Sequence, residues 1–113
     1  MSRVIGACQE NQALAFLKRH GLQLITRNYA CRLGEIDLIM RDGDCLVFVE
    51  VRYRQHRLYG GSSASVTSQK QQRLIRTAQL FLQLHPQYAE LPCRFDLIAI
   101  DQSIEWLQNS IYA

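Results

Sequence analysis

The chain has 113 residues, of which 48% are hydrophobic, enough apolar material for the core of one compact domain. No run of about 18 or more apolar residues occurs, and residues 1–6 are too few and too polar to lead a signal peptide. We therefore expect a single domain over residues 1–113 that is cytoplasmic and has no membrane partner.

The formal net charge is only +3, yet all thirteen cationic residues except Lys18 and Lys70 are arginine. Arginine favours bidentate contacts with phosphate or carboxylate. Exposed arginines are also common in soluble proteins, where they are simply solvated. The charge alone therefore raises the expectation of nucleic-acid binding only slightly.

The four cysteines lie far apart in the sequence and include no C-x-x-C pair. Neither a zinc site nor a redox motif is therefore indicated. We expect these residues to be free thiols buried in the core.

The first elements follow from hydrophobic spacing. Apolar residues at helical intervals predict an amphipathic helix over residues 5–20, and Gly21 stands where a left-handed C-terminal cap is expected. The apolar positions in 22–29 indicate a strand, and the residues at 28–33 are typical of a turn.

Two apolar runs, 36–40 and 46–51, flank the sequence Asp42-Gly43-Asp44, which is typical of a β-hairpin. Their apolar residues do not alternate cleanly with polar ones. This pattern is expected of central strands that are covered on both faces.

The second half begins with a polar, glycine-rich segment at 54–65, which predicts a mobile loop. A helix is expected over 68–85, ended by Pro86, and two strands over 94–100 and 104–107. The expected order of elements is α-β-β-β-α-β-β.

Charged residues interrupt the two central strands, and packing does not account for them. Side chains two apart on a strand share a face, so Glu35 groups with Asp37, and Glu50 with Arg52. If the hairpin loop spans the four residues 42–45, the register sets Asp37 opposite Glu50 and Glu35 opposite Arg52. The first pair would bring two carboxylates together.

Two facing carboxylates repel each other unless a proton or a cation lies between them, and magnesium suits oxygen ligands of this kind. Asp37 and Glu50 are therefore a candidate metal site. The alternative is that they form ion pairs with Arg52, Arg54 or Arg94 at the margin of the sheet. The spacing alone leaves both interpretations open.

Several segments of the chain resemble one known family of bacterial proteins, the YraN-like family. They are Gly34-Glu35-Ile36-Asp37-Leu38-Ile39, Val47-Phe48-Val49-Glu50-Val51-Arg52, Lys70-Gln71-Gln72-Arg73-Leu74 and Cys93-Arg94-Phe95-Asp96. That family is similar to archaeal Holliday-junction resolvases, within the restriction-endonuclease-like superfamily and its Asp…Glu-x-Lys active site. The resemblance implies an α/β fold in which helices flank a central mixed sheet of about five strands.

The resemblance also implies roles for individual residues. Asp37 and Glu50 would hold magnesium or manganese, and Arg52 stands where the superfamily usually has its lysine. Glu10 matches a position that adds a carboxylate in related resolvases, although it could equally be a solvated helix residue. Lys70, at the start of the second helix, could approach phosphate, or it could be an ordinary surface lysine.

The function implied by the resemblance is a magnesium-dependent endonuclease that acts on branched or otherwise structured DNA, with Asp37, Glu50, Arg52, Glu10 and Lys70 in the active site. Arginine stays protonated at physiological pH, so Arg52 cannot act as a base. Two alternatives follow: a nucleic-acid-binding module that retains the fold without cutting, and a protein-interaction domain.

Nucleic-acid binding, if present, should depend on phosphate contacts around the site and its loop. The residues expected to make them are Arg52, Arg54, Arg57, Lys70 and Arg73. Resolvases act as symmetric dimers, so the resemblance suggests a homodimer. No residue pattern indicates recognition of base sequence.

Overall fold

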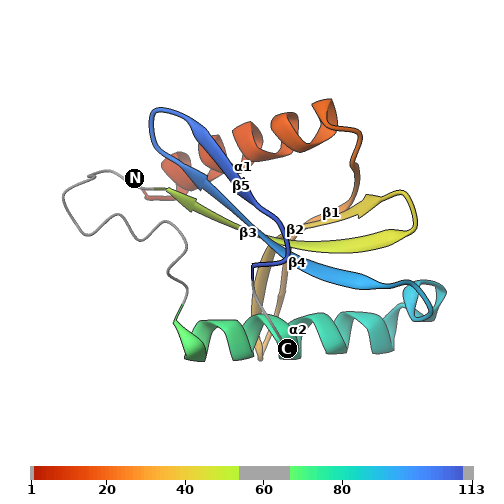
Figure 1. The fold of residues 1–113 in the computed structure, drawn as a ribbon. Helices are drawn as coiled ribbons and strands as arrows, with labels where there is room; N and C mark the ends of the chain where they lie inside the picture. The colour runs from red at the N-terminus through yellow and green to blue at the C-terminus, as the bar shows by residue number, and fades with distance from the viewer. Residues whose placement is uncertain (1, 54–66, 111–113) are drawn as a thin grey trace.

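The computed structural model describes residues 2–53 and 67–110, and the elements follow the expected order (Figure 1). They are α1 (Ser2–Arg19), β1 (Gln23–Cys31), β2 (Gly34–Asp42), β3 (Cys45–Tyr53), α2 (Ser68–Leu84), the 3₁₀ turn η1 (Pro86–Tyr88), β4 (Cys93–Ile100) and β5 (Ile104–Leu107). The predicted loop at 54–65 lies outside the described residues.

The five strands form one mixed sheet in the order β1-β2-β3-β4-β5. Neighbouring strands are antiparallel except β3 and β4, which are parallel. A parallel pair needs a long crossover connection, and the segment that contains α2 supplies it. Helix α1 covers one face of the sheet and α2 the other (Figure 1). The predicted α/β fold class is confirmed.

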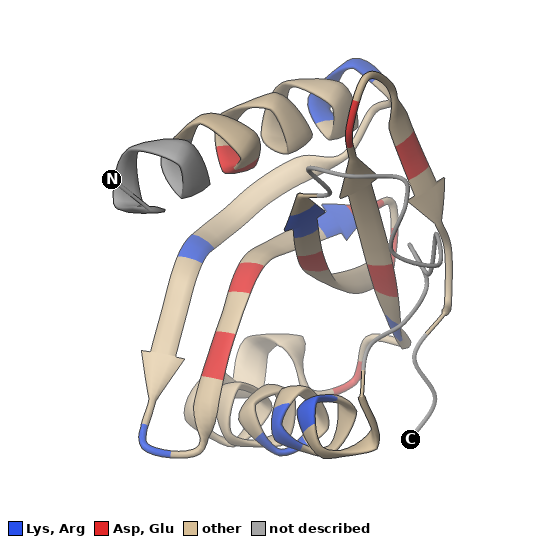
Figure 2. Cartoon of the chain, turned by 90° about the vertical axis from the view of Figure 1, so that its left-hand side faces the viewer, with Lys and Arg blue, Asp and Glu red and all other residues tan. Residues whose placement is uncertain are grey.

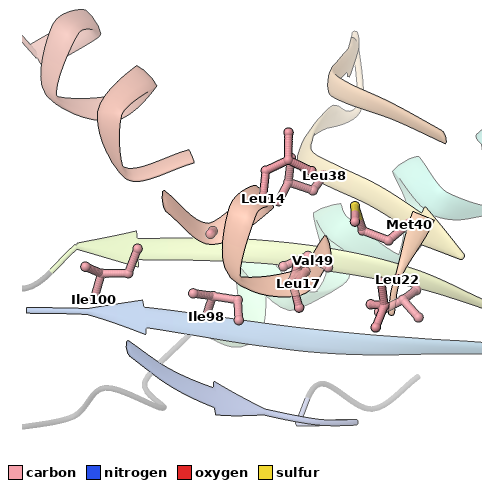
Figure 3. Packing of buried hydrophobic residues seen from close by; sticks show 10 residues of the cluster. Leu14, Leu17, Leu22, Leu38, Met40, Val49, Ile98 and Ile100 are labelled. Carbon is pink, nitrogen blue, oxygen red and sulfur yellow. The ribbon is translucent and has the colours of Figure 1, made fainter. Parts of the chain in front are cut away.

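Both faces of the central strands are buried. On the face toward α1, the packed side chains come from the helix and from β2, β3 and β4 (Figure 3); they include Leu14, Leu17, Leu38, Met40, Val49 and Ile98. On the face toward α2, a second cluster includes Ile39, Phe48, Leu74, Phe81 and Leu97. Each such side chain contributes roughly 1.5–3 kcal/mol when fully buried. This two-sided burial explains why the strands lack a polar-apolar alternation.

The β2–β3 turn is tighter than predicted. Asp42 pairs with Cys45, so the loop contains only Gly43 and Asp44 instead of four residues. Gly43 has φ 58°, the left-handed conformation that two-residue hairpin turns require. The predicted register nevertheless holds, because Arg41 pairs with Leu46.

Strand β1 also differs from the prediction, since it continues to Cys31 where a turn was expected from residue 28. Asn28 has φ 54°, so its turn-like chemistry produces a local irregularity inside the strand rather than the strand's end.

All four cysteines are free, as expected, but none is buried: Cys8 and Cys93 are exposed, and Cys31 and Cys45 are half-buried. The expectation that they fill the core was therefore wrong. Among the described helices, none is long and apolar enough to cross a membrane.

Candidate metal and phosphate site

The site begins where strands β2 and β3 separate. Their last paired residues at this end are Leu38 and Val49. Just beyond, the backbone N–H of Val51 donates a 2.8 Å hydrogen bond to Oδ2 of Asp37 rather than continuing the ladder. The Asp37 carboxylate thus accepts a bond that a backbone carbonyl would otherwise take. The strand ends diverge around it.

A cavity of about 380 Å³ lies between these strand ends and the first turns of α2. Its lining residues are Gly34, Glu35, Asp37, Glu50, Val51, Lys70, Arg73 and Leu74. Two strands supply carboxylates and one helix supplies cations, so residues far apart in the sequence meet here. Figure 2 shows acidic positions along β2 and basic positions on α2 below it.

Glu50 lies deep in this cavity, with only 4% of its surface exposed. Its Oε2 atom is 2.5 Å from Nζ of Lys70. Lys70 itself is half exposed, in the first turn of α2, where the Thr67 side chain accepts a hydrogen bond from the Lys70 backbone N–H and caps the helix. Lys70 thus lies at the surface, and its ammonium group pairs with the buried carboxylate.

The environment of Asp37 raises its pKa to about 8. Burial is the largest cause of this increase, followed by the negative charge of Glu50. A hydrogen bond to Glu50 and the charge of Glu10 also raise the pKa, whereas the hydrogen bond from the Val51 N–H lowers it. Among the described residues, no cation pairs with Asp37. At neutral pH the Asp37 carboxyl therefore keeps its proton, next to the Glu50–Lys70 ion pair.

Among the described residues, no arginine forms an ion pair with Asp37 or Glu50, as the alternative interpretation required. Arg94 instead pairs with Asp42 at 3.1 Å and with Asp96. Asp96 is fully buried and also accepts hydrogen bonds from the Trp106 indole and the Asn109 backbone N–H. It is a structural carboxylate outside the cavity.

Glu10 is held by a different partner. Its carboxylate is 3.6 Å from Arg27 on β1, and Arg27 also donates to the Asn11 side chain. The charge of Glu10 still contributes the smallest of the upward effects on the pKa of Asp37. Across residues 2–53 and 67–110, no three His, Cys, Asp or Glu side chains are arranged to hold a metal ion, so Glu10 does not complete a three-carboxylate site.

The remaining predicted residues divide into three groups. Arg73 lines the cavity. Arg52 is half-buried on β3. The predicted opposition of Glu35 and Arg52 does not form, because the β2–β3 ladder ends at Leu38 and Val49. Arg54 and Arg57 lie outside the described residues.

Two features of the site could not be found by searching for charged residues. The Val51 N–H is a backbone group, which no sequence motif marks. Gly34 lets the β1–β2 turn approach α2, because an added Cβ would lie 3.1 Å from Oγ1 of Thr77. The glycine itself was the only signal available, since a glycine at a strand end often marks a close backbone approach.

The donor set suits magnesium or manganese better than zinc. Magnesium is commonly bound through one or two carboxylates and keeps several waters, whereas zinc sites use three or four protein ligands. The carboxyl groups of half-buried Asp37 and buried Glu50 supply the oxygen ligands that a hard cation needs. The residues present therefore fit such an ion.

Fold and site together define a class: a small α/β domain of restriction-endonuclease-like element order, with two carboxylates and helix-borne cations in one cavity. The chain belongs to the family described as "Uncharacterised protein family UPF0102", which matches residues 9–100. It is 49% identical to the UPF0102 protein of Stutzerimonas stutzeri, over 96% of this chain and 95% of that protein. A UPF0102 protein of Herminiimonas arsenicoxydans is 52% identical, over 96% of this chain and 87% of its own length.

Proposed function

We propose that this protein is a metal-dependent endonuclease that hydrolyses phosphodiester bonds in branched or structured DNA. One observation carries the proposal: Asp37, Glu50 and Lys70 meet in a single cavity, although they come from β2, β3 and α2. Core packing does not require a half-buried carboxylate beside a buried one, and removing such groups from water is costly. A cation-binding role explains why they are there.

In this proposal Asp37 and Glu50 hold magnesium or manganese. When bound, such an ion stabilises negative charge on the reacting phosphate and lowers the pKa of a water molecule. Arg73, which lines the same cavity, attracts the substrate phosphate and orients it by bidentate hydrogen bonds.

In the superfamily motif a lysine follows the metal-binding glutamate two residues later, and Arg52 on β3 occupies that position here. In this proposal Lys70 of α2 takes over the role of that lysine. A lysine ammonium is a compact group that can orient the attacking water or lose its proton, whereas a guanidinium remains charged. Because Lys70 already contacts Glu50, it needs only a small rearrangement to act next to the reacting phosphate. Arg52 then serves as a second phosphate-binding cation.

The second candidate is a nucleic-acid-binding module that does not cut. Arg52 favours it, because the usual lysine is missing from the strand that carries Glu50. Such a module would bind nucleic acid in a salt-dependent manner and leave it intact. In either case a homodimer would match a two-fold symmetric junction.

The test is a cleavage assay on duplex, single-stranded and four-way-junction DNA, and on RNA, with magnesium or manganese. The proposal predicts metal-dependent cleavage by the wild type. Asp37→Asn and Glu50→Gln should abolish cleavage, whereas Asp44→Asn, in the exposed β2–β3 turn, should leave it unchanged. Binding without cleavage of any substrate would favour the non-catalytic module, and no binding at all would reject both.

A further inference from the structure

Helix α2 has an unusual polar composition on its outward face. Over its 17 residues it contains Lys70, Arg73 and Arg76 but no Asp or Glu. The exposed residues that repeat at three- to four-residue intervals along it are Gln69, Gln72, Arg73, Arg76, Gln79 and Gln83. The face is thus made of guanidinium and amide groups, with no opposing charge.

The tip of the β1–β2 hairpin adds another cation beside this face. Gly34 packs against Arg73 and Thr77 of α2, and Arg32 is exposed two residues before it. Figure 2 shows the basic position at the hairpin turn next to the basic positions of α2.

These cations are not neutralised within the described part of the chain. Arg27, Arg41, Arg94 and Lys70 all form ion pairs there. In contrast, Arg32, Arg73 and Arg76 form none with any described residue. Three exposed guanidinium groups that form no ion pair with a described residue leave a positive potential on this face that favours an anionic partner.

We propose that Arg32, Arg73 and Arg76 form a track for the phosphates of a nucleic-acid backbone. The inference rests on the proposed function and extends it, because Arg73 both lines the cavity and belongs to the outward face, so the track continues directly from the Asp37–Glu50 site. The face from Gln69 to Gln83 is roughly 20 Å long at 1.5 Å per residue. That length corresponds to about six base pairs at 3.4 Å each.

The arrangement fits a nucleic-acid backbone better than an acidic protein surface. Arginine binds phosphate bidentately, and uncharged glutamine amides can hydrogen-bond to phosphate and sugar oxygens without regard to base sequence. The track therefore binds one side of the substrate next to the cleavage site, by shape and charge.

The test measures binding of a labelled duplex of about 20 base pairs by fluorescence anisotropy, in EDTA, at salt concentrations between about 50 and 200 mM. Arg32→Gln and Arg76→Gln are exposed changes that remove one charge each and should not disturb folding. A plot of log binding constant against log salt concentration has a negative slope. We expect each single variant to make this slope less steep by about 0.9, and the double variant by about twice that. Lys18→Gln, on the exposed side of α1, is the control and should leave the slope unchanged.

The track would be rejected if wild-type protein binds with a steep salt dependence that neither arginine variant alters, and the proposed function would then survive. It would also be rejected if polyglutamate displaced the duplex at equal charge concentration, because the face would then recognise any polyanion. Absence of salt-dependent binding by the wild type would reject both the track and the proposed function.

Discussion

At the scale of single residues, the site depends on the unfavourable proximity of Asp37 and Glu50. Sequence reasoning predicted that these two would come together, because the register between the hairpin strands sets one opposite the other. It could not predict that Lys70 would pair with Glu50, since the distance between α2 and β3 depends on the tertiary packing of the crossover. It also could not reveal that Arg27 holds Glu10.

The raised pKa of Asp37 predicts how the metal-free protein responds to pH. An aspartate near pKa 4 in the unfolded chain and about 8 in the fold binds its proton more tightly when folded. The free energy of unfolding should therefore fall as pH rises from about 5.5 to about 8, by on the order of 1 kcal/mol per pH unit.

Urea denaturation in EDTA at several pH values measures this dependence. Asp37→Asn should remove most of it, since the amide does not titrate and can still accept the Val51 hydrogen bond. A wild type whose stability rises over the same range would show that Asp37 is ionised in the fold and stabilised there.

Arg52 supplies a second prediction at this scale. Arg52→Lys should be tolerated and should raise nuclease activity, because lysine restores the compact donor that the superfamily usually has beside the metal-binding glutamate. The measurement is the cleavage rate on the best substrate at saturating manganese. Loss of cleavage with an intact fold would instead mean that Arg52 binds the phosphate bidentately and cannot be replaced.

At the scale of elements, hydrophobic spacing predicted the type and order of the two α-helices and five strands that the structure describes, but not the 3₁₀ turn η1. The errors fall at turns. Asp42 joins the β2–β3 ladder instead of the loop, and Asn28 adopts a positive φ within β1. Turn chemistry in a sequence marks where the backbone bends, but tertiary pairing decides whether the strand also ends there.

The contact between the β1–β2 turn and α2 gives a prediction at this scale. Gly34→Ala should destabilise the fold by about 1–3 kcal/mol, because its φ of 153° is rarely adopted by other residues and the new Cβ would crowd Thr77 and Arg73. Gly43→Ala is the matched control: Gly43 also has positive φ, but a Cβ there meets nothing, so this variant carries the backbone cost alone.

Urea denaturation of both variants measures this difference. Equal costs for the two substitutions would mean that backbone conformation alone, and not the close approach to α2, requires Gly34.

At the scale of the whole molecule, the sheet separates an apolar layer under α1 from a layer under α2 that contains both core and site. The site occupies the end of the second layer where the strands diverge. The same helix thus packs the core with Leu74 and Phe81 and presents Lys70 to Glu50. A metal held by Asp37 and Glu50 would connect β2 and β3, so binding should stabilise the native state.

Thermal melts of wild type and Asp37→Asn, with and without manganese, test this account most directly. A metal that binds only the native state adds roughly 2.7 kcal/mol at a hundred times its dissociation constant. The wild type should therefore melt at a clearly higher temperature with manganese. Asp37→Asn should melt at the same or a higher temperature than the wild type without metal, and should lose most of the metal-induced increase. A wild type indifferent to manganese, together with a clearly less stable Asp37→Asn variant, would contradict the metal site and make Asp37 a structural carboxylate.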